Sequence, residues 1–494
     1  MLARQASLSG LLLVGTRIIT RCADLIALVV LGKFLAAAQF GIASLALSIV
    51  MLVEAVLDLP ISLALVRLQH IDDDDLGTAF TISMLRGLAV MAILAGLAGP
   101  IAAFYHRPEL FPLILALSIA PAARGLVSPN IALFNKNLSV WRNVAADLAG
   151  KFMGLIVVII FAVAWRNYWA IALGSIVSPL VTTIASYILA PFRSCLTLKK
   201  WRYFSHFFGW TTAGQVLSAL NWQLDKLILG KFLGPTQFGF FSIANDISSI
   251  PLRAVLNPIV LPLTAAFTQG RGGTAVLARR YSASAAAILA ISLPIVATQA
   301  LCSPVILQVI FGPQWNPAAP ILRLLCLSLI PALFAAPFGA LVIAVGRPDL
   351  GTQRNAVEMA VRLPLLVPAI MGYAVNGAIA VRVIAEIAAA IFCFALATRL
   401  VGDSWIRQLR AYVRPTLAAA AAYAAFATPA AARLIHSVNS FYGLAVVGVS
   451  YALTYAILIL LLWRFADCPD GPERILLGIL HRIRAPVPKE TGQT

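Results

Sequence analysis

Long apolar runs, separated by short polar or Gly- and Pro-containing breaks, recur along the whole chain. A bilayer core about 30 Å thick requires about 20 mostly apolar residues per helix. The sequence therefore predicts an all-α integral membrane protein with about 14 transmembrane helices. The expected spans are 10–32, 40–63, 78–104, 110–134, 145–165, 169–191, 207–229, 238–261, 281–301, 320–344, 355–371, 377–397, 411–432 and 441–463.

Composition supports lipid as the surrounding medium. Hydrophobic residues make up 61% of the chain and charged residues 11%, with a mean hydropathy of +0.91. The formal net charge is +18. Lys and Arg are enriched in the cytoplasmic loops of membrane proteins, so this charge does not indicate nucleic acid as a partner.

The distribution of Lys and Arg predicts the orientation of the chain. Outside the expected spans these residues concentrate in both termini and in every even connection, whereas the odd connections contain only Lys33, Arg107, Arg166, Lys231 and Arg433. The positive-inside rule then places both termini in the cytoplasm and favours an even number of helices.

Several functional classes are disfavoured. The first apolar run contains Arg17, Arg21 and Asp24, so we do not expect it to be a cleavable signal peptide. No connection is long enough for a soluble catalytic domain, and no nucleotide-binding or hydrolase motif is found, so we expect neither an enzyme nor a cofactor. The cysteines occur singly, which favours packing over a disulfide framework or metal site: Cys22, Cys195, Cys302, Cys326, Cys393 and Cys468.

An acidic stretch, HIDDDD at positions 70–75, follows the second expected span. A metal site or a nucleotide-sugar motif is one interpretation. Because no soluble domain surrounds the stretch, we favour a solvated acidic loop.

The chain contains an internal repeat. LGKFLAAAQFGIASLALSI at 31–49 and LGKFLGPTQFGFFSIANDI at 229–247 share 11 of 19 positions at a constant offset of 198 residues. Six expected spans separate the copies, so both cross the membrane in the same direction, as in transporters built from parallel repeats. We therefore predict a six-helix lobe at 1–200, a second at 201–400, two accessory helices at 401–465 and a cytoplasmic tail at 466–494.

Charged residues inside the expected spans are the candidate site. A charge at the bilayer centre costs roughly 2.5–3.5 kcal/mol on insertion scales, so such residues face a protein interior or water. Some have an opposite charge three or four residues away and are expected to neutralise each other: Arg21 with Asp24, Asp147 with Lys151, Glu358 with Arg362, and Arg382 with Glu386.

Arg86, Arg124, Arg253 and Arg323 have no such local carboxylate and, with Arg17 and Arg21, are predicted to form a cationic lumen that binds substrate. Arginine suits a pyrophosphate because its planar group donates two hydrogen bonds at once and stays protonated. The depths of Arg17 and Glu54 in the first two spans predict that these two side chains meet. Candidates for ion coupling or gating are Asp24, Glu54, Asp58, Asp225 and Lys226.

Four segments carry a resemblance to a known family: LDKLILGKFLGPTQFGFFSIA at 224–244, DDDLGTAFTISMLRG at 73–87, FGPQWNPAAPILRLL at 311–325 and AVGRPDL at 344–350. The chain resembles the polysaccharide transporter family (Wzx-like O-antigen and exopolysaccharide flippases) of the multidrug/oligosaccharidyl-lipid/polysaccharide (MOP) exporter superfamily, which also contains the MATE exporters.

The resemblance implies a MOP/MATE-like fold in the bacterial inner membrane. It also implies transfer of an undecaprenyl-pyrophosphate-linked oligosaccharide from the cytoplasmic to the periplasmic leaflet by alternating access, with a polysaccharide polymerase and chain-length machinery as partners. Two alternatives stay open: a cation-coupled multidrug exporter, and a membrane polysaccharide polymerase or ligase.

Overall fold

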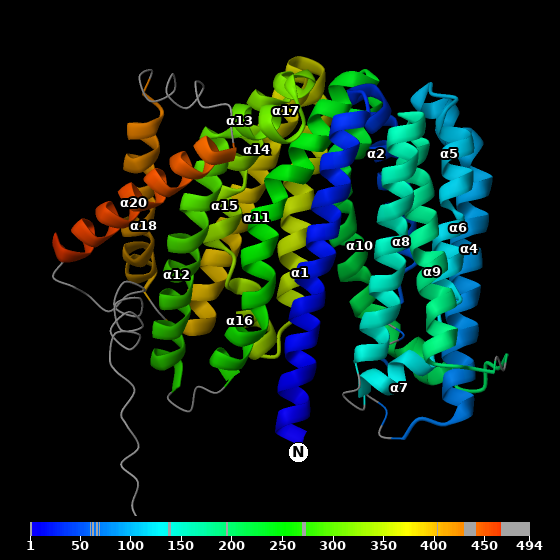
Figure 1. Cartoon of the computed structure of the whole chain (residues 1–494). Coiled ribbons are helices and arrows are strands. Elements are labelled where there is room, and N and C mark those ends of the chain that lie inside the picture. Colours follow the sequence, from blue (N-terminus) through cyan, green and yellow to red (C-terminus); the bar gives the residue numbers. More distant parts are fainter. Residues whose placement is uncertain are drawn as a thin grey trace, which may run out of the picture. The chain divides into compact units, whose positions relative to one another are not determined.

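The computed structural model of the chain is built from helices (Figure 1), and its described residues include no strand. These residues are 2–59, 61, 64, 65, 68, 70–136, 140–193, 196–268, 273–402, 404–428 and 441–465. The all-α fold predicted from the apolar runs is therefore confirmed. The predicted tail at 466–494 lies outside the described residues.

The chain divides into two compact units. Unit 1 comprises Met1–Ile243, Ile310–Trp315 and Val367–Ala378, and unit 2 comprises Ala244–Val309, Asn316–Leu366 and Ile379–Thr494. The helices of unit 1 are α1 (Leu2–Phe34), α2 (Ala37–Val56), α4 (Asp73–Tyr105), α5 (Leu110–Leu117), α6 (Ile119–Gly125), α7 (Asn130–Lys136), α8 (Trp141–Trp165), α9 (Trp169–Leu189), α10 (Trp201–Phe232) and the start of α11 (Pro235–Thr268).

Unit 2 continues α11 and contains most of the remaining helices. They are α12 (Gly273–Leu301), α13 (Ser303–Ile310), the 3₁₀ helix η1 (Pro313–Ala318), α14 (Ala319–Ser328), α15 (Ile330–Phe334), α16 (Phe338–Ala344), α17 (Asp349–Val401), α18 (Trp405–Phe426) and α20 (Phe441–Phe465). The boundaries of the predicted six-helix lobes stay a prediction.

Eight helical segments within the described ranges are long and apolar enough to cross a membrane. The predicted count of fourteen is approximate, because several expected spans are interrupted. The expected span 110–134 is divided into α5, α6 and α7, and the span 320–344 into α14, α15 and α16. Prolines such as Pro121, Pro331 and Pro337 lie at these interruptions, and a proline removes one helical hydrogen bond and disfavours a continuous helix.

The expected spans 355–371 and 377–397 are the two arms of α17, which are separated by a non-helical residue. Its 53 residues are bent at Ala374, whose φ of 49° and ψ of −127° are not helical. A Cβ at Gly377 would collide with the carbonyl oxygen of Ala369, so the chain can close this bend only with glycine there. The chain therefore turns within the connection that the sequence predicts at 372–376.

Small residues let α8 and α9 pack side by side in unit 1 (Figure 1). A Cβ at Gly154 would lie 2.8 Å from the Cβ of Ser178 and 3.0 Å from the carbonyl oxygen of Gly174. Lipid provides no hydrophobic drive for helix association, so such close backbone approach is the usual source of packing energy in membranes.

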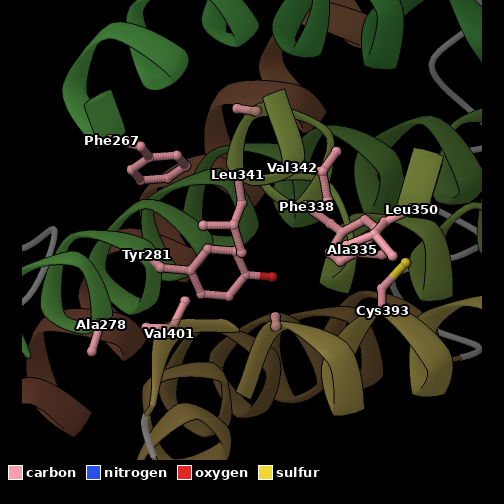
Figure 2. Close-up of a cluster of buried hydrophobic side chains, with 12 residues drawn as sticks. Phe267, Ala278, Tyr281, Ala335, Phe338, Leu341, Val342, Leu350, Cys393 and Val401 are labelled. Carbon is pink, nitrogen blue, oxygen red and sulfur yellow. The ribbon is translucent and has the colours of Figure 1, made fainter. Parts of the chain in front are cut away.

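Unit 2 has a buried apolar core formed by four helices (Figure 2). Tyr281 of α12 and Phe338 of α16 are each 1% exposed, and Cys393 and Val401 of α17 are fully buried beside them. Phe267 of α11 packs on the same cluster, with its ring 6.2 Å from that of Tyr281. This core fixes the second arm of α17, which carries charged residues described below.

The acidic stretch at 70–75 is not only the solvated loop that we expected, because Asp72 caps α4 and Asp73–Asp75 form its first turn. The Asp72 side chain accepts a hydrogen bond of 2.7 Å from the backbone N–H of Asp75, and the Asp75 side chain accepts one of 3.1 Å from the backbone N–H of Asp72. Lys199 and Lys200 form ion pairs with Asp74 and Asp72, each at 3.2 Å. The carboxylates thus cap the helix and favour its positive end.

These bonds give a pH-dependent contribution to stability. The backbone hydrogen bond from Asp75 lowers the pKa of Asp72 below its ordinary value of 3.8. A lowered folded-state pKa means that the ionised group contributes stability above about pH 4, and that this stability is lost as the pH falls through the folded-state pKa. We expect Asp72→Ala to lower the melting temperature in detergent micelles at pH 7, and the difference from the parent to narrow by pH 3.

Asp72→Asn is the matched control for this prediction, because it keeps a capping oxygen and removes only the charge. It should melt between the parent and Asp72→Ala at pH 7. An Asp72→Ala difference that is equally large at both pH values would contradict the assignment to the ionised carboxylate.

Candidate functional site

The first charged cluster joins α1 to α8. The carboxylate of Asp24 forms ion pairs with Lys151 and with Arg21, the latter at 3.7 Å. Arg21 is 61% exposed in its side chain. The expected Arg21–Asp24 pair is thus confirmed, whereas Lys151 pairs with Asp24 of another helix and not with Asp147 of its own.

Arg17 lies one helical turn before Arg21 on α1. Its side chain is exposed, and it has no ionic partner among the residues that the structure describes. Four residues of helix correspond to about 6 Å along the axis. Two incompletely neutralised guanidinium groups therefore follow each other on the helix.

A second cluster lies at the end of α2 and is held by arginines of two other helices. The Nε and Nη2 atoms of Arg124 on α6 donate to the two carboxylate oxygens of Glu54, both at 2.7 Å. Arg86 of α4 forms an ion pair of 2.7 Å with Asp58 and donates to the backbone oxygen of Glu54 at 3.4 Å. Cations beside helix C-terminal carbonyls are favourable, so Arg86 also stabilises the end of α2.

This cluster corrects one expectation from the sequence. The expected contact between Arg17 and Glu54 is not formed, because Arg124 occupies both oxygens of Glu54. The carboxylate partners of Arg86 and Arg124 lie 28 and 70 residues away in the chain. The sequence analysis considered only partners three or four residues away on the same helix, so it did not predict these two pairs. Only a search for charges at equal depth on different helices could have indicated such pairs.

The remaining predicted site residues of unit 1 lie on α10. Asp225 is buried, at 5% exposure, and has polar contacts. The ammonium group of Lys226 lies 3.5 Å from the hydroxyl of Ser44 on α2. Lys226 therefore connects α10 to α2, the helix that also carries Glu54.

Arg253 and Arg323 belong to unit 2. Arg253 of α11 is half-buried and has polar contacts. Arg323 of α14 donates to the hydroxyl of Tyr423 on α18 at 3.0 Å, and its guanidinium lies 5.9 Å from the centre of that ring. The structure therefore divides the six predicted substrate arginines into four in unit 1 and two in unit 2, and their role in substrate binding stays a prediction.

Unit 2 also contains a buried ionic network on α17. Glu358 is 5% exposed and pairs with Arg362 at 3.3 Å, as its spacing predicts, and with Arg354 at 3.5 Å. Arg354 also binds Glu386 of the second arm at 3.1 Å. Arg382 donates to Asn245 of α11 at 3.0 Å. The sequence already carried a signal for Arg354, since it lies four residues before Glu358.

A metal centre has no support in this part of the protein. No group of three or more His, Cys, Asp or Glu side chains that could hold an ion occurs among the described residues. The guanidinium groups of this site are hydrogen-bond donors that can bind an anionic group.

By structure, the chain is similar to the lipid II flippase MurJ in its inward closed conformation, with a TM-score of 0.73 over 92% of this chain and 98% of that one at 13% identity. It is also similar to an inward-facing multidrug-resistance MATE transporter of the MOP superfamily, with a TM-score of 0.59 over 78% and 94% of the two chains at 14% identity. The chain therefore has the fold of these two solved structures, and its apolar helices are those of a multi-pass membrane protein.

The family model described as "Polysaccharide biosynthesis protein" matches residues 30–320, and the chain belongs to that family. The lipopolysaccharide biosynthesis protein WzxC of Escherichia coli is 24% identical over 72% of this chain and 73% of its own length. The succinoglycan biosynthesis transport protein ExoT of Rhizobium meliloti is 24% identical over 60% and 61%. The resemblance found in the sequence is thus confirmed.

If Glu54 pairs with Arg124 and not with Arg17, charge-swapped variants of these residues should behave differently. Glu54→Arg places two cations together and should reduce export to background. The double change Glu54→Arg with Arg124→Glu restores opposite charges at the same positions and should recover part of the export. Complementation of a polysaccharide-deficient strain measures both variants.

The matched control is Glu54→Arg with Arg17→Glu. No recovery is expected there, because Arg17 does not contact Glu54. Recovery with Arg17→Glu and none with Arg124→Glu would contradict the contacts described here.

The α17 network predicts a stability effect. Removing one member of a buried ionic group leaves its partners uncompensated at a cost of about 3 kcal/mol or more. Glu358→Gln should therefore lower the free energy of unfolding in micelles by about 3 kcal/mol. Asp349→Asn, which breaks the exposed pair of Arg347 and Asp349 at the start of the same helix, is the control and should change the stability little. Equal stability of Glu358→Gln and the parent would contradict a structural role.

Proposed function

We propose that this protein transfers a lipid-linked oligosaccharide repeat unit across the bacterial inner membrane, from the cytoplasmic to the periplasmic leaflet, by alternating access. The substrate is an oligosaccharide on undecaprenyl pyrophosphate, made for a cell-surface polysaccharide. Membership of the polysaccharide biosynthesis family and the MurJ-like fold support this proposal.

The observation that carries it is the pair of exposed arginines on α1. Arg17 has no ionic partner among the described residues, and Arg21 shares Asp24 with Lys151. A guanidinium left in lipid is costly, so successive arginines on a membrane helix favour a water-filled passage. An arriving pyrophosphate supplies the negative charge that these groups lack, while its lipid chain stays in the bilayer.

The partly exposed Arg124–Glu54 pair supplies a further binding group beside those of Arg17 and Arg21. Arg124 is 47% exposed although both its donors bind Glu54. A phosphate oxygen that approaches Arg124 competes with a carboxylate, and such exchange makes binding reversible. Asp24, Glu54 and Asp58 are then the groups through which a coupling ion or proton would act, and Asp225 with Lys226 would act in gating.

Two alternatives are less favoured. A multidrug exporter for cationic compounds would be opposed by the excess positive charge around Arg17 and Arg21. A polymerase or ligase would need catalytic groups in a sizeable loop, whereas the connections of this chain are short. A polymerase and chain-length machinery are instead proposed as partners that use the transferred unit.

Deletion of the gene tests the proposed function. We expect lipid-linked repeat units of normal composition to accumulate on the cytoplasmic face, where an added glycosidase reaches them only in inverted vesicles. Failure to form the units, or their arrival and persistence as unpolymerised units in the periplasm, would contradict a flippase and favour an enzyme.

The α1 arginines are tested in the same assay. Arg17→Gln with Arg21→Gln should reduce transfer about tenfold or more, because about 1.4 kcal/mol of lost binding corresponds to tenfold. Arg166→Gln, which changes an exposed arginine in the loop after α8, should leave transfer unchanged. Equal transfer by the double variant and this control would refute a role of the α1 arginines.

A further inference from the structure

The two repeat copies touch at their equivalent residues within unit 1. A Cβ at Gly41 would collide with the carbonyl oxygen of Pro235, and a Cβ at Gly239 with the carbonyl oxygen of Ala37. Ala37 and Pro235, like Gly41 and Gly239, are 198 residues apart and so correspond in the repeat. A reciprocal contact of this kind indicates a local two-fold relation between the start of α2 and the start of α11.

Beside this contact, a loop of the first half binds the end of a second-half helix. Arg107 is 8% exposed, and its Nη2 donates to the backbone oxygen of Leu233, directly after α10, at 2.6 Å. The hydroxyl of Tyr105 donates to the oxygen of Leu227 at 3.1 Å. The ammonium of Lys231 binds the oxygen of Phe104 and lies 4.5 Å from its ring centre.

The second half makes the same connection in the opposite direction. The indole N–H of Trp315 donates to the backbone oxygen of Gly32, near the end of α1, at 2.6 Å, and Gln314 donates to the same oxygen at 2.9 Å. Trp315 is fully buried, and the rings of Phe40 and Phe240 each meet it edge-on at 5.9 Å.

The two loops occupy corresponding positions in the sequence. Arg107 lies five residues before Pro112, and Trp315 lies five residues before Pro320, at the start of the next apolar helix in each half. The helices α1 and α10 end at Phe34 and Phe232, which are again 198 residues apart. In each half, the loop before this apolar helix therefore contacts the end of the first helix of the other half.

The chemistry of these bonds suits a reversible closure. The last carbonyls of a helix have no partner within the helix, so they accept a donor from outside or from water. When the two loops withdraw, water can satisfy the same carbonyls. The burial of Arg107 and Trp315 keeps water out only while both bonds hold.

We propose that the bonds of Arg107 to Leu233 and of Trp315 and Gln314 to Gly32, named here the swapped latch, close the membrane face opposite the N-terminus and separate when the protein opens to the periplasm. This inference rests on the proposed function and on the predicted cytoplasmic N-terminus. It assigns Arg107, Gln314 and Trp315 as gating residues, none of which was predicted from the sequence as a functional residue.

Thiol labelling tests the swapped latch without any substrate. Ser242 is fully buried, its hydroxyl has no hydrogen-bond partner in the described part of the protein, and it lies one turn along α11 from Gly239. Ser242→Cys is therefore a conservative reporter directly behind the closure. It is placed in a chain that keeps Cys326, also fully buried, and has the other five cysteines replaced by alanine.

A membrane-impermeant maleimide is added from the periplasmic side, and labelling of the two thiols is followed by mass spectrometry. Arg107→Met and Trp315→Phe each keep an apolar side chain and remove the donor. We expect each to raise the labelling rate at position 242 about fivefold, and their combination more, with Cys326 unchanged. Arg166→Met, outside the swapped latch, should leave both rates at the parent value. Unchanged labelling at position 242 in the double variant would overturn the proposal.

Labelling of Cys326 in a variant would indicate that the variant has lost its fold. In that case, an engineered disulfide provides a second test of the swapped latch. A Cβ at Gly32 would collide with the ring of Phe311, so the pair Gly32→Cys and Phe311→Cys is within reach of a disulfide in the closed state. We expect oxidation to stop export and a reductant to restore it, whereas export that continues with the disulfide formed would overturn the proposal. A protein that opens in the labelling test but transfers no lipid-linked oligosaccharide would refute the proposed function and leave the swapped latch intact.

Discussion

The cost of placing charge in a low-dielectric membrane governs how this protein is put together. A charged side chain on a membrane-spanning helix must contact an opposite charge, a carbonyl group or water. Most of the charged side chains in the candidate site contact a group on another helix. Asp24 connects α1 to α8, Glu54 connects α2 to α6, and Arg86 connects α4 to α2. These bonds therefore hold the helices of unit 1 in register as well as supplying candidate binding groups.

The two units use their charges differently. In unit 2, Glu358 and Arg362 are almost fully buried and are held by neighbours on the same long helix, so they resemble a structural element. In unit 1, Arg21 and Arg124 stay substantially exposed despite their carboxylate partners. An anion can compete for an exposed ionic pair more easily than for a buried one, because less desolvation and rearrangement are needed. This contrast is the physical basis for our proposal that the substrate is recognised in unit 1.

Hydrogen bonds to backbone carbonyls at helix ends have a complementary role. A single hydrogen bond contributes about 1 kcal/mol net, so a small set of them holds a closure that can still open within a transport cycle. Glycine is required where the two repeat copies touch at Gly41 and Gly239, since any side chain would collide with the facing backbone. The repeat in the sequence is thus also the contact surface between its own copies.

The fold class follows from the sequence alone, because apolar runs as long as a bilayer is thick leave only membrane helices as a solution. The family follows from it as well, through the motifs at 224–244 and 311–325, and so does the pairing of Glu358 with Arg362, which reflects the helical period. The three-dimensional arrangement was needed to show that Glu54 binds Arg124 and not Arg17, how sharply the chain turns at Ala374 between the two arms of α17, and that Trp315 reaches Gly32. The reason is that helical periodicity relates residues within a few turns, whereas contacts between helices depend on rotation and depth that no local pattern encodes.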